Sequence, residues 1–242
     1  MKAVRSAMVM AAGLGTRMRP LTDDKPKPMV RLADKTLLDH CLDQLRIAGV
    51  DHIVVNVHYL PEQVEAHLAA HAQDFDVHVS DERALLLETG GGLVKAQGFL
   101  PEEPFYCVNS DNIWTDNGEN SLKRLAAQWD GGRMDALLLV VPRERAHCHP
   151  GRGDFFLDDD GALQRRGIHD FAPYVYIGIQ LISHRLLRDA PEGPFSTNLL
   201  WDRAIAEGRL FAIVHEGEWF DIGSPQAIEP TEKRLLELAD NG

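Results

Sequence analysis

The 242-residue chain carries a formal net charge of −12, with 37 acidic side chains against 25 Lys and Arg. Proteins that bind a nucleic-acid backbone gather lysine and arginine, so this balance argues against a nucleic-acid partner. The three cysteines, Cys41, Cys107 and Cys148, are isolated and indicate neither a disulfide framework nor a zinc site. No apolar run approaches the ~18 residues of a membrane span, and residues 7–12 are too short for a signal-peptide core. We therefore expect a cytoplasmic protein with no membrane partner.

The first 150 residues alternate between short apolar runs and amphipathic segments. Apolar spacing predicts a helix over residues 37–45 capped by Thr36, and Pro61 opens a second helix. This alternation predicts βαβ units, and therefore an α/β fold with a Rossmann-like, doubly wound, mainly parallel sheet flanked by helices. The runs predicted as its buried strands are residues 7–12, 53–57, 76–80, 105–109 and 136–141.

After about residue 150 the pattern changes. Residues 154–166 resemble a hairpin whose turn is Asp159-Asp160-Gly161, and residues 174–182 alternate as a strand. We predict one domain over residues 1–242, in which 1–150 form mainly a nucleotide-binding half and 151–242 a small α+β, sugar-binding elaboration. Further helices are expected near residues 197–207 and 225–238, with strands at 210–214 and 218–222.

A glycine-rich segment follows the first predicted strand, at the point where an α/β sheet opens its ligand crevice. Gly13 and Gly15 allow a sharp turn that brings backbone amides close to phosphate oxygens, and Arg17 can add a bidentate contact. Alone, this glycine pair is also compatible with an ordinary turn. A dinucleotide fingerprint would need a glycine at Met18, and a Walker loop would need the absent Gly-Lys-Ser/Thr.

Three prolines in the same segment favour a fixed anion site. Pro20, Pro26 and Pro28 restrict the backbone, so Lys25 and Lys27 are predicted to lie on an extended segment. Residues 17–35 hold six basic and three acidic side chains within an acidic protein. Such a local charge suits a small polyanion better than a long one.

With this segment in place, the chain resembles the sugar-phosphate nucleotidyltransferase family in motifs that run from residue 8 to residue 223. The resemblance implies a phosphate loop at 13–27, a nucleobase loop at 88–93, a sugar pocket, and two metal-binding strand ends. The motifs are Gly-Leu-Gly-Thr-Arg, Pro-Leu-Thr and Pro-Lys-Pro-Met within residues 13–29, then 88-ETGGGL-93, 109-NSD-111, 151-GRGDF-155, 176-YIGI-179 and 219-WFDIG-223.

The family resemblance implies an Mg²⁺-dependent enzyme in which a sugar 1-phosphate attacks the α-phosphorus of a nucleoside triphosphate and expels pyrophosphate. It implies catalytic roles for Arg17, Lys27 and Asp111, and a metal site formed by Asp111 and Asp221, whose carboxylates are ligands that Mg²⁺ prefers. Without the resemblance, both aspartates are also compatible with cap or turn residues. The residues implied for substrate binding are Ala12, Gly13, Gly15, Thr16, Arg17, Lys27, Glu82, Gly90, Gly91, Asn109, Asp154 and Gly178.

Asp154 narrows the resemblance, because many relatives have glutamate there. Together with residues 88–92 and 149–155, it resembles the N-acetylmuramate-1-phosphate uridylyltransferases of cell-wall recycling, which implies UTP and N-acetylmuramate 1-phosphate as substrates. Mannose- or heptose-1-phosphate guanylyltransferases would share the phosphate and metal motifs. Another alternative is a non-catalytic regulatory subunit with the same fold. The presence of Lys27, Asp111 and Asp221 argues against it, because such a subunit would be expected to lose the lysine or a metal-binding aspartate. Residues 147–150, His-Cys-His-Pro, are expected to form a sugar-side loop, with zinc binding as the alternative.

Overall fold

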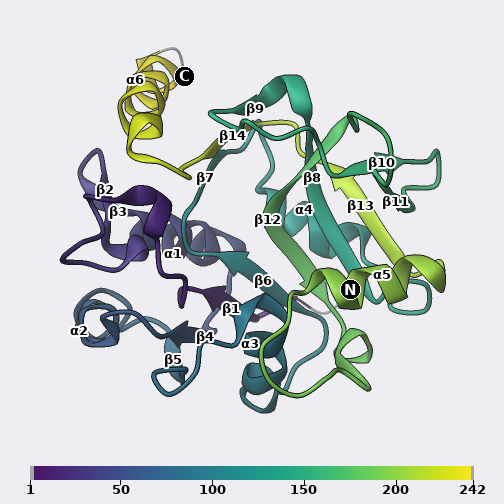
Figure 1. The fold of residues 1–242 in the computed structure, drawn as a ribbon, viewed down its shortest axis with the longest axis horizontal. Helices are drawn as coiled ribbons and strands as arrows, with labels where there is room; N and C mark the ends of the chain where they lie inside the picture. Colours follow the sequence, from purple (N-terminus) through teal and green to yellow (C-terminus); the bar gives the residue numbers. More distant parts are fainter. Residues whose placement is uncertain (1–2, 241–242) are drawn as a thin grey trace.

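A twisted, mixed β-sheet forms the centre of the computed structural model, which describes residues 3–240 (Figure 1). Short apolar runs of the sequence form its strands, as predicted. Across the sheet, the main strands are β5 (Asp76–Asp81), β4 (His52–Val57), β1 (Ser6–Met10), β6 (Phe105–Asn109), β12 (Tyr174–Ile182), β8 (Ala136–Pro142) and β13 (Leu210–Val214).

Among these main strands, β12 is the one that runs antiparallel to its neighbours. β1 pairs in parallel with β4 and β6, β4 with β5, and β8 with β13. β12 is antiparallel to both β6 and β8, so it is the reversed strand between two parallel groups. The predicted hairpin is present as β10 (Phe155–Leu157) and β11 (Leu163–Arg165), and β10 joins the sheet beside β12. The predicted Rossmann-like sheet is thus confirmed, with β12 and this hairpin as its antiparallel part.

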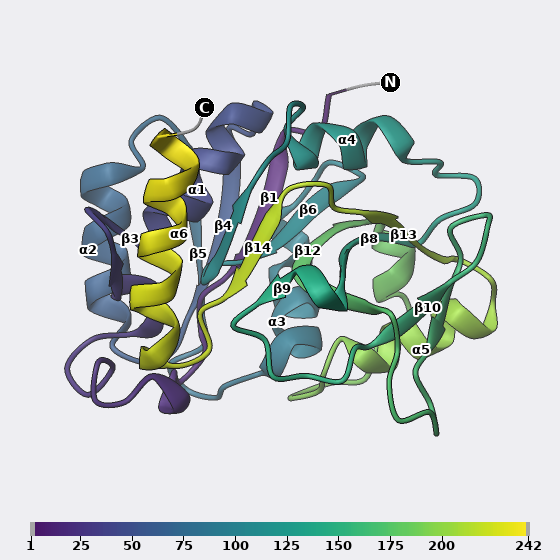
Figure 2. The same ribbon diagram turned by 90° about the horizontal axis from the view of Figure 1, so that it is seen from above.

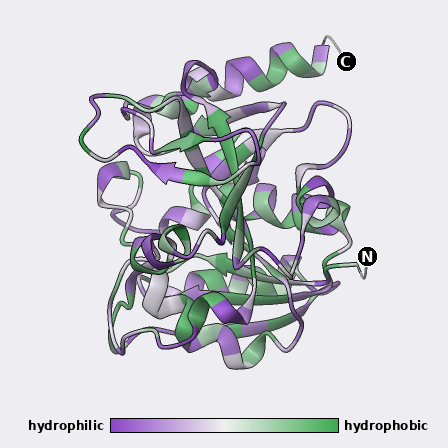
Figure 3. Ribbon diagram, turned by 90° about the vertical axis from the view of Figure 1, so that its right-hand side faces the viewer, coloured by the Kyte–Doolittle hydropathy of each residue, from purple (hydrophilic) through white to green (hydrophobic). Residues whose placement is uncertain are grey.

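Helices cover both faces of the sheet (Figure 2). Alternate strand residues face opposite sides: Ala7 and Val9 belong to one core and Met8 to the other. Figure 3 shows the apolar residues gathered along the central strands between the helices. The first core is covered by α1 (Leu37–Ala48), α2 (Pro61–His71) and α4 (Ser121–Gln128), and the second by α3 (Glu88–Ala96) and α5 (Asn198–Ala206).

A smaller core packs the N-terminal loop against the end of the chain. Met18 and Leu32 from the loop meet Phe220 and Ile222, and α6 (Ile228–Asp240) packs on this group through Leu235. The short elements in and around this region are β2 (Arg31–Leu32), β3 (Lys35–Thr36), and a three-stranded sheet of β7 (Asn112–Thr115), β14 (Glu218–Asp221) and β9 (Ala146–His147).

The helix boundaries follow local signals where those signals are strong. Thr36 caps α1 as predicted, because its hydroxyl accepts from Asp39 N–H at 3.1 Å and the Asp39 carboxylate accepts from Thr36 N–H. The predicted helix over 225–238 is a 3-10 turn, Pro225–Ala227, followed by α6. α4 and β7 were not predicted. None of the helices within residues 3–240 combines the length and apolar character needed to cross a bilayer.

Candidate active site

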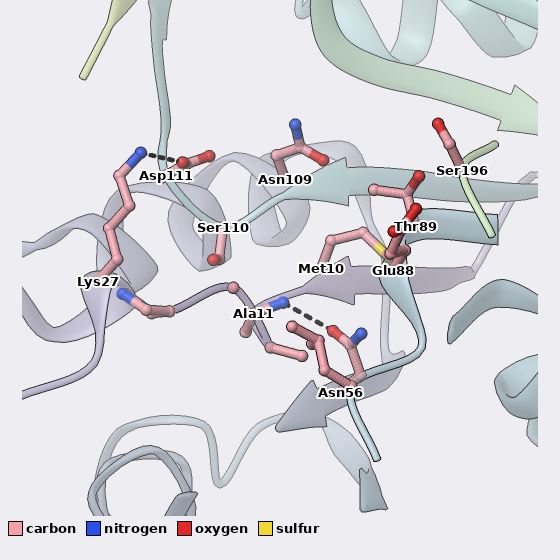
Figure 4. Close-up of a pocket in the computed structure, with 14 residues that line it drawn as sticks. Met10, Ala11, Lys27, Asn56, Glu88, Thr89, Asn109, Ser110, Asp111 and Ser196 are labelled. Carbon is pink, nitrogen blue, oxygen red and sulfur yellow. Dashed lines mark hydrogen bonds and ion pairs between the residues drawn. The ribbon is translucent and has the colours of Figure 1, made fainter. Parts of the chain in front are cut away.

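A pocket of about 380 Å³ opens where β1 and β6 end (Figure 4). The two strands are parallel neighbours, so their carboxyl ends meet at the same edge of the sheet. Lys27 and Asp111 lie at one end of this strand-end pocket, and Glu88, Thr89 and Ser196 lie at the other. Its lining residues are Met10, Ala11, Ala12, Gly13, Lys27, Pro28, Asn56, Leu86, Glu88, Thr89, Asn109, Ser110, Asp111 and Ser196.

A chain of buried hydrogen bonds fixes the start of the glycine loop. Ala11 N–H donates to Asn56 Oδ1 at 2.7 Å, and Asn56 Nδ2 donates to Glu82 Oε1 at 2.8 Å. The other oxygen of Glu82 accepts from Leu87 N–H at 3.0 Å, and the Glu82 side chain is buried. Glu82, predicted to bind substrate, does not line the pocket. Its carboxylate instead holds Asn56 and the chain before α3.

The two glycines of the loop have different roles. Gly15 adopts φ +62°, and a Cβ there would lie 3.1 Å from Lys27 Cβ, so the turn and the close approach both require glycine. Gly13 lines the pocket, and no heavy atom lies within 4 Å of the position its Cβ would take. The open side of the loop is therefore at Gly13. Thr16 and Arg17 follow in a 3-10 turn, Thr16–Met18, where both are exposed and lie outside the pocket lining.

The predicted extended segment for Lys25 and Lys27 is wrong for Lys27, which begins a 3-10 turn, Lys27–Met29. Pro26 is extended before it, and the turn directs the Lys27 ammonium to the carboxylate of Asp111. Lys25 lies at the surface beside Asp24, 3.3 Å away. The proline-rich segment therefore presents one of its two lysines to the pocket.

Asp111 and Asp221 approach each other through strand pairing. Asp111 follows β6, and Asp221 at the end of β14 pairs in register with Asn112, the next residue after Asp111. The Asp221 carboxylate lies 2.8 Å from His149 Nδ1, so each aspartate has a basic partner. Arg17 is close by, since its Nη1 lies 3.3 Å from the position of a Cβ on Gly223.

This donor set suits one kind of metal ion. Within residues 3–240, no three His, Cys, Asp or Glu side chains gather as a metal-ligand group. Mg²⁺, however, binds proteins through one or two carboxylates and completes its shell with water and substrate phosphates. Asp111 and Asp221 fit that mode of binding, and their role as ligands stays a prediction.

Gly90 and Gly91 lie inside α3, not in a loop before the helix as predicted. Both amides donate to Phe195 O, at 2.8 and 3.2 Å, so these donors are already used. A Cβ on Gly90 would lie 2.3 Å from the Phe195 ring, and one on Gly91 would lie 2.4 Å from Gly193 O. The glycines therefore let α3 pack against residues 193–195. At the start of the helix, Glu88 borders the pocket with φ +58°, a strained conformation often found at functional sites.

A second pocket, of about 310 Å³, adjoins the first because Thr89 and Ser196 line both. From the two motifs predicted to form the sugar pocket it contains Asp154, Phe155 and Tyr176, and Asp154 Oδ2 accepts from Tyr176 N–H at 2.9 Å. Burial raises the pKa of Tyr176 well above its usual value, so its hydroxyl stays neutral. We call this the aromatic pocket, and it is lined by Thr89, Asp154, Phe155, Arg165, Tyr176, Ser196, Thr197, Asn198 and Trp201.

Gly178 lies on β12 beside Asn109, a residue of the strand-end pocket. The pairing of β12 with β8 is irregular between Tyr176 and Gln180, and Gly178 adopts φ +74° there. A Cβ on Gly178 would lie 2.6 Å from Asn109 Nδ2 and 2.4 Å from Asn112 Nδ2. Gly178 therefore gives space to Asn109, which lines the strand-end pocket, and any larger residue would displace it.

Some residues of the two pockets were not predicted. Asn56 and Ser196 line the strand-end pocket, and Arg165 and Trp201 line the aromatic pocket. Asn56 had a signal, since a polar residue occurs within an otherwise apolar strand, at the edge of the sheet where the glycine loop begins. The other three carry no such signal, because their segments meet only in the folded chain.

Comparison with known proteins agrees with this geometry. Residues 6–148 match the nucleotidyl transferase family. The chain is 43% identical over 239 residues to N-acetylmuramate alpha-1-phosphate uridylyltransferase from Caulobacter vibrioides, covering 98% of this chain and 99% of that protein. It is 28% identical to mannose-1-phosphate guanyltransferase from Neurospora crassa, over 91% of this chain and 61% of that protein. The fold matches the inositol-1-phosphate CTP transferase from T. maritima with a TM-score of 0.78, 18% identity, and coverage of 96% and 94%. The chain therefore belongs to the nucleotidyl transferase family.

Proposed function

We propose that this nucleotidyltransferase joins UTP and N-acetylmuramate 1-phosphate to give UDP-N-acetylmuramate and pyrophosphate, a step of cell-wall recycling in the cytoplasm. The observation that carries the choice of substrates is the 43% identity, over nearly the full length of both chains, to an enzyme named for that reaction. Three free cysteines are compatible with a reducing compartment. The site geometry supports the reaction class independently of that name.

The chemistry needs alignment and charge neutralisation more than proton transfer. The attacking phosphate oxygen is already ionised, so no general base is required, and two repelling anions must be held in line. Lys27, part-buried beside the open backbone at Gly13, is placed to bridge the sugar phosphate and the α-phosphate. Arg17, exposed near Asp221, is placed to contact the triphosphate from outside the pocket.

We further propose that Asp111 and Asp221 hold Mg²⁺. A bound Mg²⁺ would supply positive charge at the α-phosphate. Lys27 holds the Asp111 carboxylate, and His149 holds that of Asp221, 2.8 Å away, so both ligands are oriented before substrate binds. Asp111 lies in the turn between β6 and β7, and Asp221 ends β14, which pairs with β7 so that Asp221 lies opposite Asn112.

The experiment that tests the substrates is a panel of four nucleoside triphosphates against N-acetylmuramate, N-acetylglucosamine, mannose and heptose 1-phosphates, read by pyrophosphate release. UTP with N-acetylmuramate 1-phosphate is expected to give the highest kcat/KM. Faster release from GTP with mannose or heptose 1-phosphate would overturn the proposal in favour of a guanylyltransferase. No release from any pair, by protein that melts cooperatively, would instead indicate a non-catalytic subunit.

A further inference from the structure

Arg165 is the one positively charged side chain among the residues that line the aromatic pocket, and Asp154 is the one negatively charged. Arg165 lies opposite Phe155 in the β10–β11 register, so the two side chains share a face of the hairpin. Its guanidinium carbon lies 5.0 Å from the centre of the Phe155 ring and 5.5 Å from that of Trp201. The cation is therefore held against the aromatic wall of the pocket.

Hydrogen bonds hold the Arg165 guanidinium in place but use only some of its N–H donors. Arg165 Nε donates to Asp202 Oδ1 at 2.7 Å, and Nη2 donates to Asn198 O at 3.0 Å. Arginine has five N–H donors in a planar fork. No residue within 3–240 accepts from Nη1. Asp202 is 58% exposed, so water screens its charge and the guanidinium remains attractive to an anion.

Because the aromatic pocket adjoins the strand-end pocket, it has room for the sugar of a sugar 1-phosphate under the proposed function. Thr89 and Ser196 join it to the strand-end pocket, and Tyr176 lies two residues before Gly178 on β12, whose neighbour is Asn109. One oxygen of Asp154 accepts from Tyr176 N–H, which leaves the other for sugar hydroxyls. The pocket thus offers an acceptor at Asp154 and a donor at Arg165.

N-acetylmuramate differs from N-acetylglucosamine by a lactyl ether, which ends in a carboxylate. A carboxylate entering a pocket that already contains Asp154 needs a cationic partner, because an unpaired charge is costly to remove from water. Arginine meets carboxylates with strong, charge-assisted hydrogen bonds. Resting on the proposed function above, we propose that Arg165 binds the lactyl carboxylate and so selects muramyl over glucosaminyl phosphate.

The test compares kcat/KM for N-acetylmuramate 1-phosphate and N-acetylglucosamine 1-phosphate, with saturating UTP, in the wild type and in Arg165→Gln. The variant is expected to lose about 10- to 100-fold on the muramyl substrate, the range for a hydrogen bond to a charged group, and to change little on the glucosaminyl one. Arg46→Gln is the matched control. Arg46 also lies over a ring, 5.0 Å from Phe75, pairs with Asp74 at 2.7 Å and is 31% exposed against 30% for Arg165. Arg46→Gln should leave kcat/KM for both substrates unchanged.

A substrate analogue keeps the inference testable if Arg165→Gln folds poorly. Wild-type protein should lose a similar factor when the lactyl carboxylate is replaced by a carboxamide, and Arg165→Lys, which keeps the charge, should retain part of the muramyl preference. A wild type that uses muramyl phosphate but shows no preference, or an Arg165→Gln variant that keeps the preference, would overturn the role of Arg165 alone. A wild type that does not use muramyl phosphate with UTP would overturn the proposed function itself.

Discussion

The strand-end pocket and the aromatic pocket touch at Thr89 and Ser196 but are built in different ways. The first is formed largely by backbone and short side chains where the parallel strands β1 and β6 end. The second is formed by side chains from a hairpin, the reversed strand β12 and the start of α5. By the proposed function, the phosphates therefore bind at the edge of the sheet itself, and the sugar binds against the β10–β11 hairpin.

The largest expected effect is that of Asp111→Asn. This variant tests whether the strand-end pocket carries out the reaction in the same way with every sugar 1-phosphate. Asp111→Asn keeps the shape but removes the charge that pairs with Lys27 and, by our proposal, binds the metal. Loss of such a preorganised electrostatic group should lower kcat by about 10²–10³ or more, equally for every sugar 1-phosphate. Pyrophosphate release measures the loss, and thermal melting checks the fold.

The matched control for that variant is Asp76→Asn, at the edge strand β5, where the carboxylate is 82% exposed and pairs with His52. It should leave kcat unchanged. Substantial residual turnover in Asp111→Asn, or a loss that depends on the sugar, would contradict the assignment of the reaction to this pocket.

Two experiments test the proposal that Asp111 and Asp221 bind Mg²⁺: removal of the metal and a substitution beside Asp221. Chelation should abolish activity and added Mg²⁺ should restore it. His149→Gln removes the ring that orients Asp221, and such supporting residues change metal affinity by about 10- to 100-fold. The Mg²⁺ concentration for half-maximal rate should rise accordingly, with kcat at saturating Mg²⁺ nearly unchanged. Full activity in the presence of a chelator would refute the metal proposal.

Gly178→Ala tests the packing of β12 against Asn109 of the strand-end pocket. The added methyl would crowd Asn109 and Asn112 at 2.6 and 2.4 Å, at a residue with φ +74°. We expect a loss of about 1–3 kcal/mol in the free energy of unfolding, from overpacking and backbone strain, and a lower kcat/KM with every sugar. Gly118→Ala is the control, because Gly118 has φ +94° but nothing within 4 Å of the Cβ position. Equal losses in the two variants would show that the backbone alone, not the crowding of Asn109, is responsible.

The same contrast explains what the sequence could predict. Gly13, Lys27 and Asp111 were placed correctly in one pocket, because a contiguous segment and a strand end meet at one edge of a parallel sheet. Arg165 and Trp201 were not found, because they come together only after the hairpin pairs and α5 packs beneath it. Side-chain packing of this kind leaves no local pattern.

Motifs also identified which residues lie near the site, but not what those residues contact. The sequence 88-ETGGGL-93 marked Gly90 and Gly91, but their lack of a side chain serves the contact of α3 with residues 193–195. Glu82 was predicted as a substrate-binding residue, whereas its buried carboxylate holds Asn56. α4 was missed because it has only eight residues, so its apolar face is short and is formed by two buried leucines, Leu122 and Leu125. A motif fixes which segment is near a site, and packing decides which atoms face it.

The smallest expected effect lies outside both pockets, at the contact between β14 and α6. Arg234 donates to the Glu218 carboxylate, with Nε at 3.0 Å, and holds the pKa of Glu218 below its usual value. A folded-state pKa below the unfolded value means that the ionised pair stabilises the fold at neutral pH. That contribution falls away as the pH drops from the ordinary pKa of 4.5 through the folded value. Arg234 is 41% exposed, so Glu218→Gln should cost less than about 1 kcal/mol of unfolding free energy at pH 7.

Chemical denaturation at a series of pH values from 7 downward measures this difference, which should shrink as the pH falls and wild-type Glu218 becomes protonated. A difference that stays constant as the pH falls would assign the effect to packing instead of charge. Because Glu218 and Arg234 line neither pocket, substrate preference should be the same in Glu218→Gln and the wild type. Glu218 lies on the strand that ends at Asp221, so a changed Mg²⁺ requirement with unchanged sugar preference would show that the ion pairs of Glu218 influence the proposed metal site through β14.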